Sequence, residues 1–93
     1  MMEKFPITIR AVLFYKGSVK TYKEDTPGEF CKCTITLYTV DDQKLYVELR
    51  NSNISMLDVI PEGTIVDVDI IFLGSEKNDK RYNNLIATKI KKV

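Results

Sequence analysis

Aromatic and basic side chains alternate with apolar ones in two neighbouring segments, residues 30–39 and 44–50. A repeat of every second position is the pattern of a β-strand with one buried face and one outward face. The outward face carries Lys32, Thr34, Thr36, Tyr38, Lys44, Tyr46, Glu48 and Arg50. Aromatic rings stack on nucleobases, at about 1–3 kcal/mol per base, and cations neutralise phosphates. The outward face is therefore a candidate surface for single-stranded DNA or RNA.

Two polar segments carry further rings and cations that can flank this face. Residues 15–29 contain Tyr15, Lys16, Lys20, Tyr22 and Lys23, and residues 75–82 contain Lys77, Lys80, Arg81 and Tyr82. We interpret residues 15–29 as one long mobile loop and residues 75–81 as a shorter one. The longer loop is a candidate for function, because long loops in compact domains are often functional. The predicted nucleic-acid-binding residues are Lys32, Thr34, Tyr38, Lys44, Tyr46, Arg50, Tyr22, Lys80, Arg81 and Tyr82.

Other interpretations of the same face remain open. Tyr, Thr and Lys are common on ordinary strand surfaces, and Glu24, Asp25 and Glu48 would weaken the binding of an anion. The net charge of +1 favours no class of partner. A protein-interaction or oligomer-assembly module would also expose tyrosines, and an oligosaccharide-binding module is a third possibility. Salt dependence separates these classes, because phosphate contacts weaken steeply with salt.

The other chemically suggestive residues favour structural roles. Cys31 and Cys33 share one strand face with Ile35 and Leu37, and the chain has no His. A zinc site needs four ligands, and a disulfide between these two positions has poor geometry, so we expect two reduced core cysteines. Asp67 and Asp69 are expected to face water, since unpaired buried carboxylates are costly. We predict no enzymatic activity, no metal and no cofactor.

Length and composition indicate one soluble domain spanning residues 1–93. Apolar residues make up 44% of the chain and charged residues 29%, which is ordinary for a globular protein. The longest apolar run, Ile70 to Leu73, is too short to cross a bilayer. With no signal peptide recognised, we expect a cytoplasmic protein without a membrane partner, and a homo-oligomer is possible.

Periodicity and turn residues predict five strands and one short helix. The helix is expected to be capped by Ser52 or Asn53 and ended by Pro61. The closing hairpin is expected to have a charged tip. The predicted strands are residues 5–14, 30–39, 44–50, 65–74 and a last one that begins near residue 82, and the helix covers residues 51–60.

Finer predictions concern register and core. If residues 41–43 form the turn, Tyr38 lies opposite Tyr46 and the two rings form a stacking platform. A bulge between Ala87 and Ile90 would allow both of these residues to face inward. The predicted core is Ile7, Ile9, Leu13, Cys31, Cys33, Ile35, Leu37, Leu45, Val47, Leu49, Leu57, Val66, Val68, Ile70 and Leu85.

Five antiparallel strands with a helix between the third and fourth predict an all-β OB-fold, a small Greek-key barrel. From Phe30 to Ile90 the chain resembles small bacterial OB-fold proteins related to single-stranded-DNA-binding protein. The resemblance rests on residues 44–49, 57–63, 66–68 and 82–90. It implies single-strand binding on the face of the second and third strands. Housekeeping members also carry a Gly-rich linker and an acidic tail, which this sequence lacks, so no housekeeping role is expected.

Overall fold

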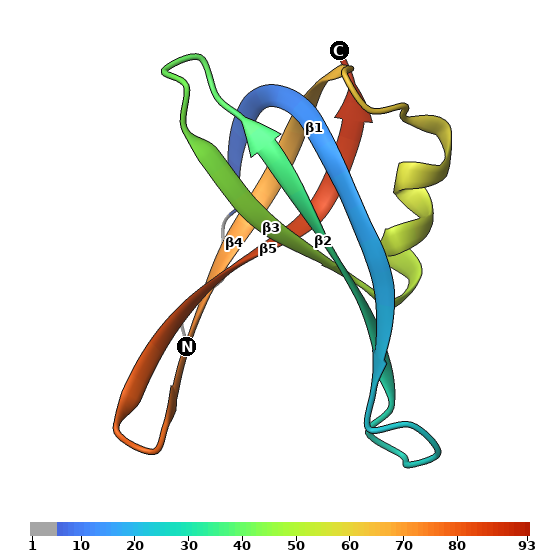
Figure 1. Ribbon diagram of the computed structural model, residues 1–93, viewed down its shortest axis with the longest axis vertical. Coiled ribbons are helices and arrows are strands. Elements are labelled where there is room, and N and C mark those ends of the chain that lie inside the picture. Colours follow the sequence, from blue (N-terminus) through green and yellow to red (C-terminus); the bar gives the residue numbers. More distant parts are fainter. Residues whose placement is uncertain (1–5) are drawn as a thin grey trace.

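The strands of the computed structural model, which describes residues 6–93, close into a barrel (Figure 1). The elements are β1 (Ile7–Tyr22), β2 (Phe30–Tyr38), β3 (Lys44–Arg50), the 3₁₀ helix η1 (Asn51–Val59), β4 (Ile65–Lys77) and β5 (Lys80–Lys92). Around the barrel the strand order is β1-β2-β3-β5-β4. This confirms the predicted five-stranded barrel with a helix between the third and fourth strands. Not every pairing is antiparallel, because β3 and β5 meet in parallel at Glu48 and Ile86.

β1 is the strand that closes the barrel. Its first part, Ile7 to Val12, pairs with β4, and its second part, Val12 to Tyr22, pairs with β2. Two register shifts, at Phe14 and at residues 17–18, bend the strand between these partners. The predicted loop over residues 15–29 is therefore wrong for residues 15–22, and the connection to β2 is only residues 23–29.

Two hairpins extend beyond the barrel as arms (Figure 1). We call residues 18–32 the β1–β2 arm and residues 74–83 the β4–β5 arm. The predicted loop at residues 75–81 is wrong, since ladder pairing continues to Lys77 and Lys80. Asn78 and Asp79 form the turn with φ of 52° and 65°. Two consecutive positive φ angles are typical of the tight turn whose twist matches a two-stranded ribbon. The predicted charged hairpin tip is confirmed.

The core follows the predicted alternation in β2, β3 and β4. The fully buried side chains include Leu13, Ile35, Leu37, Val47, Leu49, Val66 and Val68. The bulge predicted in β5 is present, because Asp69 pairs with Lys89 while Ile70 pairs with Ala87. Ala87 and Ile90 are consequently both buried.

Some predicted core positions lie at the margin of the barrel. Ile7 is 53% exposed, which contradicts its assignment to the core. It belongs to the correct strand face but lies where β1 enters the barrel, beyond the layer of packed side chains. Ile9, Leu45 and Leu85 are half-buried and pack against the core cluster. Cys31 is also half-buried.

The β2–β3 hairpin has a different register from the predicted one. Tyr46 lies opposite Thr36, and Tyr38 lies opposite Lys44. The Thr39 N–H donates to the Gln43 carbonyl at 2.9 Å, so residues 40–42 form the loop. A shift of two positions preserves which residues face inward. The predicted faces are therefore correct, but the predicted pairing of Tyr38 with Tyr46 is wrong.

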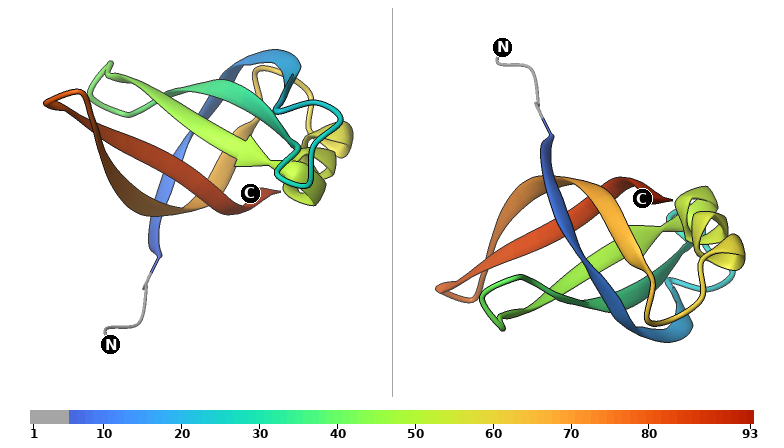
Figure 2. Two further views of the ribbon diagram at one scale, coloured as in Figure 1. Left: turned by 90° about the horizontal axis from the view of Figure 1, so that it is seen from below. Right: turned by 90° about the horizontal axis from the view of Figure 1, so that it is seen from above.

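η1 lies against one end of the barrel (Figure 2). Leu57 is its buried residue, and Ile54 and Met56 pack against the core. Lys16 of β1 holds the helix in place, because its Nζ donates to the Leu57 carbonyl at 3.0 Å. The predicted caps are wrong, since the residue before the first turn is Arg50 and no side chain caps the helix. No helix among residues 6–93 has the length and apolar character to span a membrane.

The outward face of β1 and β4 carries two cross-strand polar pairs, one of them an ion pair. Arg10 donates to both carboxylate oxygens of Asp67, at 2.8 and 3.1 Å, and Thr8 donates to Asp69. The hydrogen bonds from Arg10 lower the pKa of Asp67 below its usual range. Asp67 and Asp69 are thus half-exposed and satisfied by partners, not simply solvated.

Gly17 lies where β1 approaches β2 most tightly. A Cβ atom at this position would lie 2.5 Å from the Thr34 carbonyl oxygen. We predict that Gly17→Ala destabilises the fold by about 1–3 kcal/mol, because the backbone must shift to relieve the contact. Urea denaturation measures the free energy of unfolding.

Gly74 provides the matched control for this substitution. It also lies in a strand, but a Cβ there would have its nearest neighbour at 3.9 Å. Gly74→Ala is expected either to leave the free energy of unfolding unchanged or to raise it by up to about 1 kcal/mol, because alanine lowers the conformational entropy of the unfolded chain. Equal unfolding free energies for the two variants would contradict the close approach at Gly17.

Candidate nucleic-acid interface

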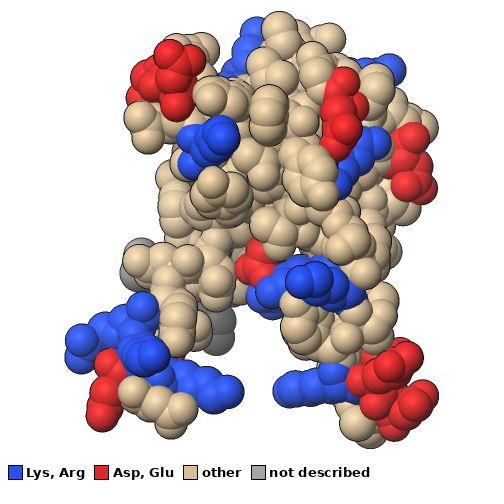
Figure 3. All heavy atoms as spheres, viewed as in Figure 1, with Lys and Arg blue, Asp and Glu red and all other residues tan. Residues whose placement is uncertain are grey.

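Three adjoining hollows form a groove between the two arms (Figure 3). The first, about 500 Å³, is lined by Tyr15, Gly17, Ser18, Lys20, Tyr22, Lys32, Thr34 and Thr36. The second, about 300 Å³, is lined by Thr34, Tyr46, Glu48, Asn83, Asn84 and Leu85. The third, about 330 Å³, is lined by Gly74, Ser75, Glu76, Arg81, Tyr82 and Asn83. Thr34 lines both the first and the second hollow, and Asn83 lines both the second and the third, so the hollows follow one another from β1 to the β4–β5 arm.

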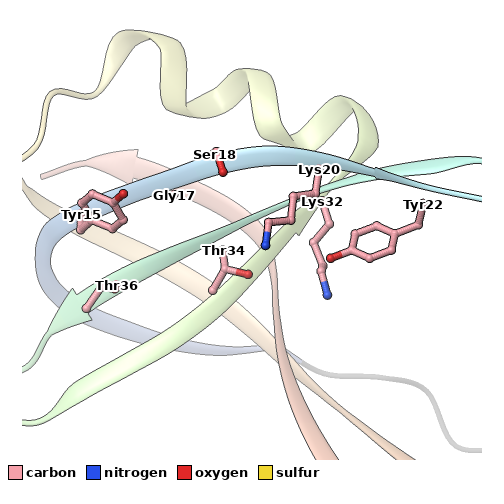
Figure 4. Close-up of a pocket in the computed structure, with 8 residues that line it drawn as sticks. All are labelled: Tyr15, Gly17, Ser18, Lys20, Tyr22, Lys32, Thr34 and Thr36. Atoms are coloured by element: carbon pink, nitrogen blue, oxygen red, sulfur yellow. The ribbon is translucent and has the colours of Figure 1, made fainter. Parts of the chain in front are cut away.

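Four of the five tyrosines line this groove: Tyr15, Tyr22, Tyr46 and Tyr82. Tyr15, Tyr46 and Tyr82 are 55%, 61% and 47% exposed, so their rings are open to a ligand. Figure 4 shows Tyr15 and Tyr22 at opposite ends of the first hollow, with Lys20 and Lys32 between them. Rings spaced along a groove, with Lys20 between them, provide both kinds of contact that a single strand needs.

An aromatic pair stands at the β1–β2 end of the groove. Tyr22 and Phe30 stack with their centroids 5.2 Å apart and their planes 16° from parallel. A cation lies over each ring: Lys32 Nζ is 4.9 Å from the centre of Tyr22, and the Arg50 guanidinium is 5.6 Å from that of Phe30. These cation–π contacts hold both rings in fixed orientations.

The same two cations share one carboxylate. Glu48 is 8% exposed, and its Oε1 lies 2.8 Å from Lys32 Nζ while its Oε2 lies 3.5 Å from Arg50 Nη2. The hydrogen bond to Glu48 raises the pKa of Lys32 above its usual value. The outward face of β2 and β3 therefore contains an internal ion-pair network at its centre and is not uniformly basic.

Of the predicted site residues, Arg50 and Lys80 line none of the three hollows, and Tyr38 and Lys44 lie outside the groove altogether. Tyr38 packs edge-on against Phe14 with centroids 5.3 Å apart, and Lys44 Nζ lies 5.6 to 5.7 Å from both rings. Tyr38 lines a separate small hollow with residues of β1. The predicted platform of Tyr38 and Tyr46 is thus replaced by Tyr46 alone.

The remaining predicted residues belong to the β4–β5 arm. Arg81 and Tyr82 line the third hollow, and Lys80 begins β5 at the tip of the arm, opposite Lys77. Arg81 Nε lies 3.8 Å from Glu76, but both side chains are well exposed, at 83% and 60%. Such exposed pairs contribute little, so Arg81 is available to a ligand. Lys16, by contrast, donates its Nζ hydrogen bond to the Leu57 carbonyl of η1.

Sequence reasoning missed several residues of this interface. Alternation identifies Phe30 only as the first residue of a strand, yet Phe30 completes the aromatic pair with Tyr22. Ser18, Asn83 and Asn84 also line the groove. Their signal is weak, because Ser and Asn are equally common in turns. They become part of a site only because the arms place them beside Thr34 and Tyr46.

The cysteines occupy two different environments. Cys33 is buried and donates to the Gly17 carbonyl at 3.2 Å, and burial raises the pKa of its thiol. Cys31 is half-buried beside Thr21, so its assignment to the core is wrong. Both are free thiols. Among residues 6–93, no three His, Cys, Asp or Glu side chains are grouped as a metal site requires.

A closed barrel in this strand order, with a groove between its two longest hairpins, is an OB-fold protein. No protein-family model matches the chain, and no curated protein sequence matches it. Solved structures do match. The mitochondrial single-stranded DNA binding protein Rim1 of S. cerevisiae superposes with a TM-score of 0.66 at 12% identity, over 98% of this chain and 97% of Rim1.

Two further solved structures have the same fold. A second form of Rim1 gives a TM-score of 0.58 at 15% identity, over 99% of this chain and 97% of that one. The N-terminal domain of PriB from Thermoanaerobacter tencongensis, described as dimeric, gives 0.52 at 18% identity, with 96% of each chain covered. The OB-fold expected from the strand order and from the resemblance is therefore confirmed. At sequence identities of 12–18%, the similarity to these structures concerns the fold alone.

The aromatic pair of Tyr22 and Phe30 predicts an energetic coupling. In a double-mutant cycle of Tyr22→Ala and Phe30→Ala, the two losses of unfolding free energy should differ from additivity by about 0.5–1.5 kcal/mol. Urea denaturation of the parent, the single variants and the double variant provides the four values. Strict additivity would contradict a direct stacking contact.

Proposed function

We propose that this chain binds single-stranded nucleic acid, with DNA as the preferred ligand, along the groove between its arms. The observation that carries the proposal is the placement of Tyr15, Tyr22, Tyr46 and Tyr82 in three adjoining hollows. Single strands expose the faces of their bases, and stacking on such rings is favourable for every base. The neighbours described as single-stranded DNA binding proteins support the choice of DNA.

In this proposal the groove and the arms contribute different contacts. Tyr46 lies at the centre, where the amides of Asn83 and Asn84 and the carboxylate of Glu48 also line the second hollow. Lys20 and Arg81 lie on opposite arms and meet the phosphates at either side. The net charge of +1 favours moderate affinity, because few cations remain for phosphates once the ion pairs are subtracted.

A homo-oligomer is a second, compatible proposal. An apolar hollow of about 180 Å³ lies outside the groove and is lined by Arg10, Ala11, Val12, Tyr38, Thr39, Val40 and Ile65. Val40 is 98% exposed and Ile65 is 52% exposed, which is unusual for apolar side chains that sit together. A contact between copies at this surface would leave the groove free. An assembly module that does not bind nucleic acid is the alternative that the following experiment tests.

Tyr46→Ala is the direct test of the groove. Removal of its exposed ring should weaken the binding of a labelled single-stranded oligonucleotide by about 1–3 kcal/mol, or roughly 5- to 150-fold, at low salt. Fluorescence anisotropy measures the dissociation constant at two salt concentrations. The parent should lose affinity as salt increases, because phosphate contacts release counterions.

Tyr38→Ala is the matched control, since Tyr38 is a tyrosine of the neighbouring strand that lies outside the groove. It should lower stability through its contact with Phe14 and leave the dissociation constant unchanged. Equal losses of affinity for both variants would place the strand elsewhere on the surface. A parent that binds no oligonucleotide at low salt would sink the proposal and favour the assembly module.

A further inference from the structure

Glu48 is a buried acid at the centre of a groove that is proposed to bind a polyanion. It is the one charged side chain among residues 6–93 that is buried, and it lines the second hollow beside Tyr46. A carboxylate in this position should repel a phosphate, unless it is already paired. Its role in the proposed function is therefore not explained by stacking or by attraction.

The partners of Glu48 are the two cations at the β1–β2 end of the face. Lys32 and Arg50 lie opposite each other across β2 and β3, and Glu48 lies beside both. Neither cation is well exposed, with side-chain exposures of 27% and 37%. Each is also held over a ring of the Tyr22–Phe30 pair. Both are thus enclosed between a carboxylate and an aromatic ring.

Carboxylates and phosphates bind the same donors in the same way. A phosphate that bound Lys32 or Arg50 would compete with Glu48 for the same cationic charge, and a buried carboxylate that loses its partners is strongly destabilising. We propose that Glu48 is an internal competitor for phosphate. It keeps Lys32 and Arg50 out of phosphate contact, so that bases lie on this part of the groove while Lys20 and Arg81 meet the phosphates. The inference rests on the proposed function and assigns these three residues as positioning residues.

The test is the salt dependence of single-strand binding by Glu48→Gln. A neutral amide releases Lys32 and Arg50, so the slope of log affinity against log salt should steepen by about 0.7 for each additional phosphate that the protein neutralises. Over a fourfold change in salt, each additional phosphate corresponds to a roughly threefold larger loss of affinity. Anisotropy with labelled oligothymidine at about 50 to 200 mM salt measures the slope.

Three variants complete the design. Glu48→Asp keeps the charge and should retain the parent slope. In the Glu48→Gln background, Lys32→Gln should lower the steepened slope again by about 0.7, because a released Lys32 would contact one phosphate. Lys20→Gln is the positive control on the β1–β2 arm and should reduce the slope by about 0.7. If Glu48→Gln does not fold, the double variant Lys32→Gln/Glu48→Gln removes the ion pair as a unit and should still steepen the slope by about 0.7 through Arg50.

The outcomes separate this inference from the proposed function. A parent that binds oligothymidine together with an unchanged slope for Glu48→Gln would overturn the competitor role alone. A slope that neither Lys32→Gln nor Arg50→Gln lowers in the Glu48→Gln background would do the same, because neither cation would then have been released to a phosphate. A parent that binds nothing at low salt would overturn both proposals.

Discussion

The bend in β1 is the constraint on which the rest of the structure depends. One strand must pair with β4 at its beginning and with β2 at its end, and only then does the sheet close. The bend is achieved by extra residues near Phe14 and at residues 17–18, where Gly17 comes too close to Thr34 for a side chain. Bulges of this kind increase local twist and redirect a strand. Here they direct the β1–β2 arm away from the barrel and thereby form one wall of the groove.

The sequence predicted the barrel well where strands have a buried face. Alternation in residues 30–39, 44–50 and 65–72 placed Ile35, Val47 and Val68 correctly. The breaks in that pattern also carried information, since the mismatch between Ala87 and Ile90 predicted a bulge that the β4–β5 ladder contains. The prediction was wrong for the two arms, because they lack such a buried face. In the arms neither strand face is deeply buried, so residues 18–22 and 75–81 show no apolar period and resemble loops.

The sequence predicted which residues of the site share the outward strand face, but not which of them lie opposite each other across β2 and β3. The face of β2 and β3 is correct because a register error of two positions preserves parity. Which residues meet is a different matter, and it depends on whether Val40 ends a strand or begins a turn. Val40 is β-branched and is typical of a strand, yet it lies in the loop. That difference places Tyr38 against Phe14 and leaves Tyr46 alone at the centre. The pairing of Glu48 with Lys32 and Arg50 likewise follows from tertiary geometry.

The central claim is that a single strand lies in the groove between the arms. Backbone amide chemical shifts, recorded while oligothymidine is added at low salt, test it most directly. Shifts should change in residues 15–22, 32–36, 46–50 and 80–85, where the three hollows lie. They should stay constant on the opposite side of the barrel, around Thr8, Asp67 and Lys91. Changes confined to that opposite side, or to the apolar hollow beside Val40, would contradict the account.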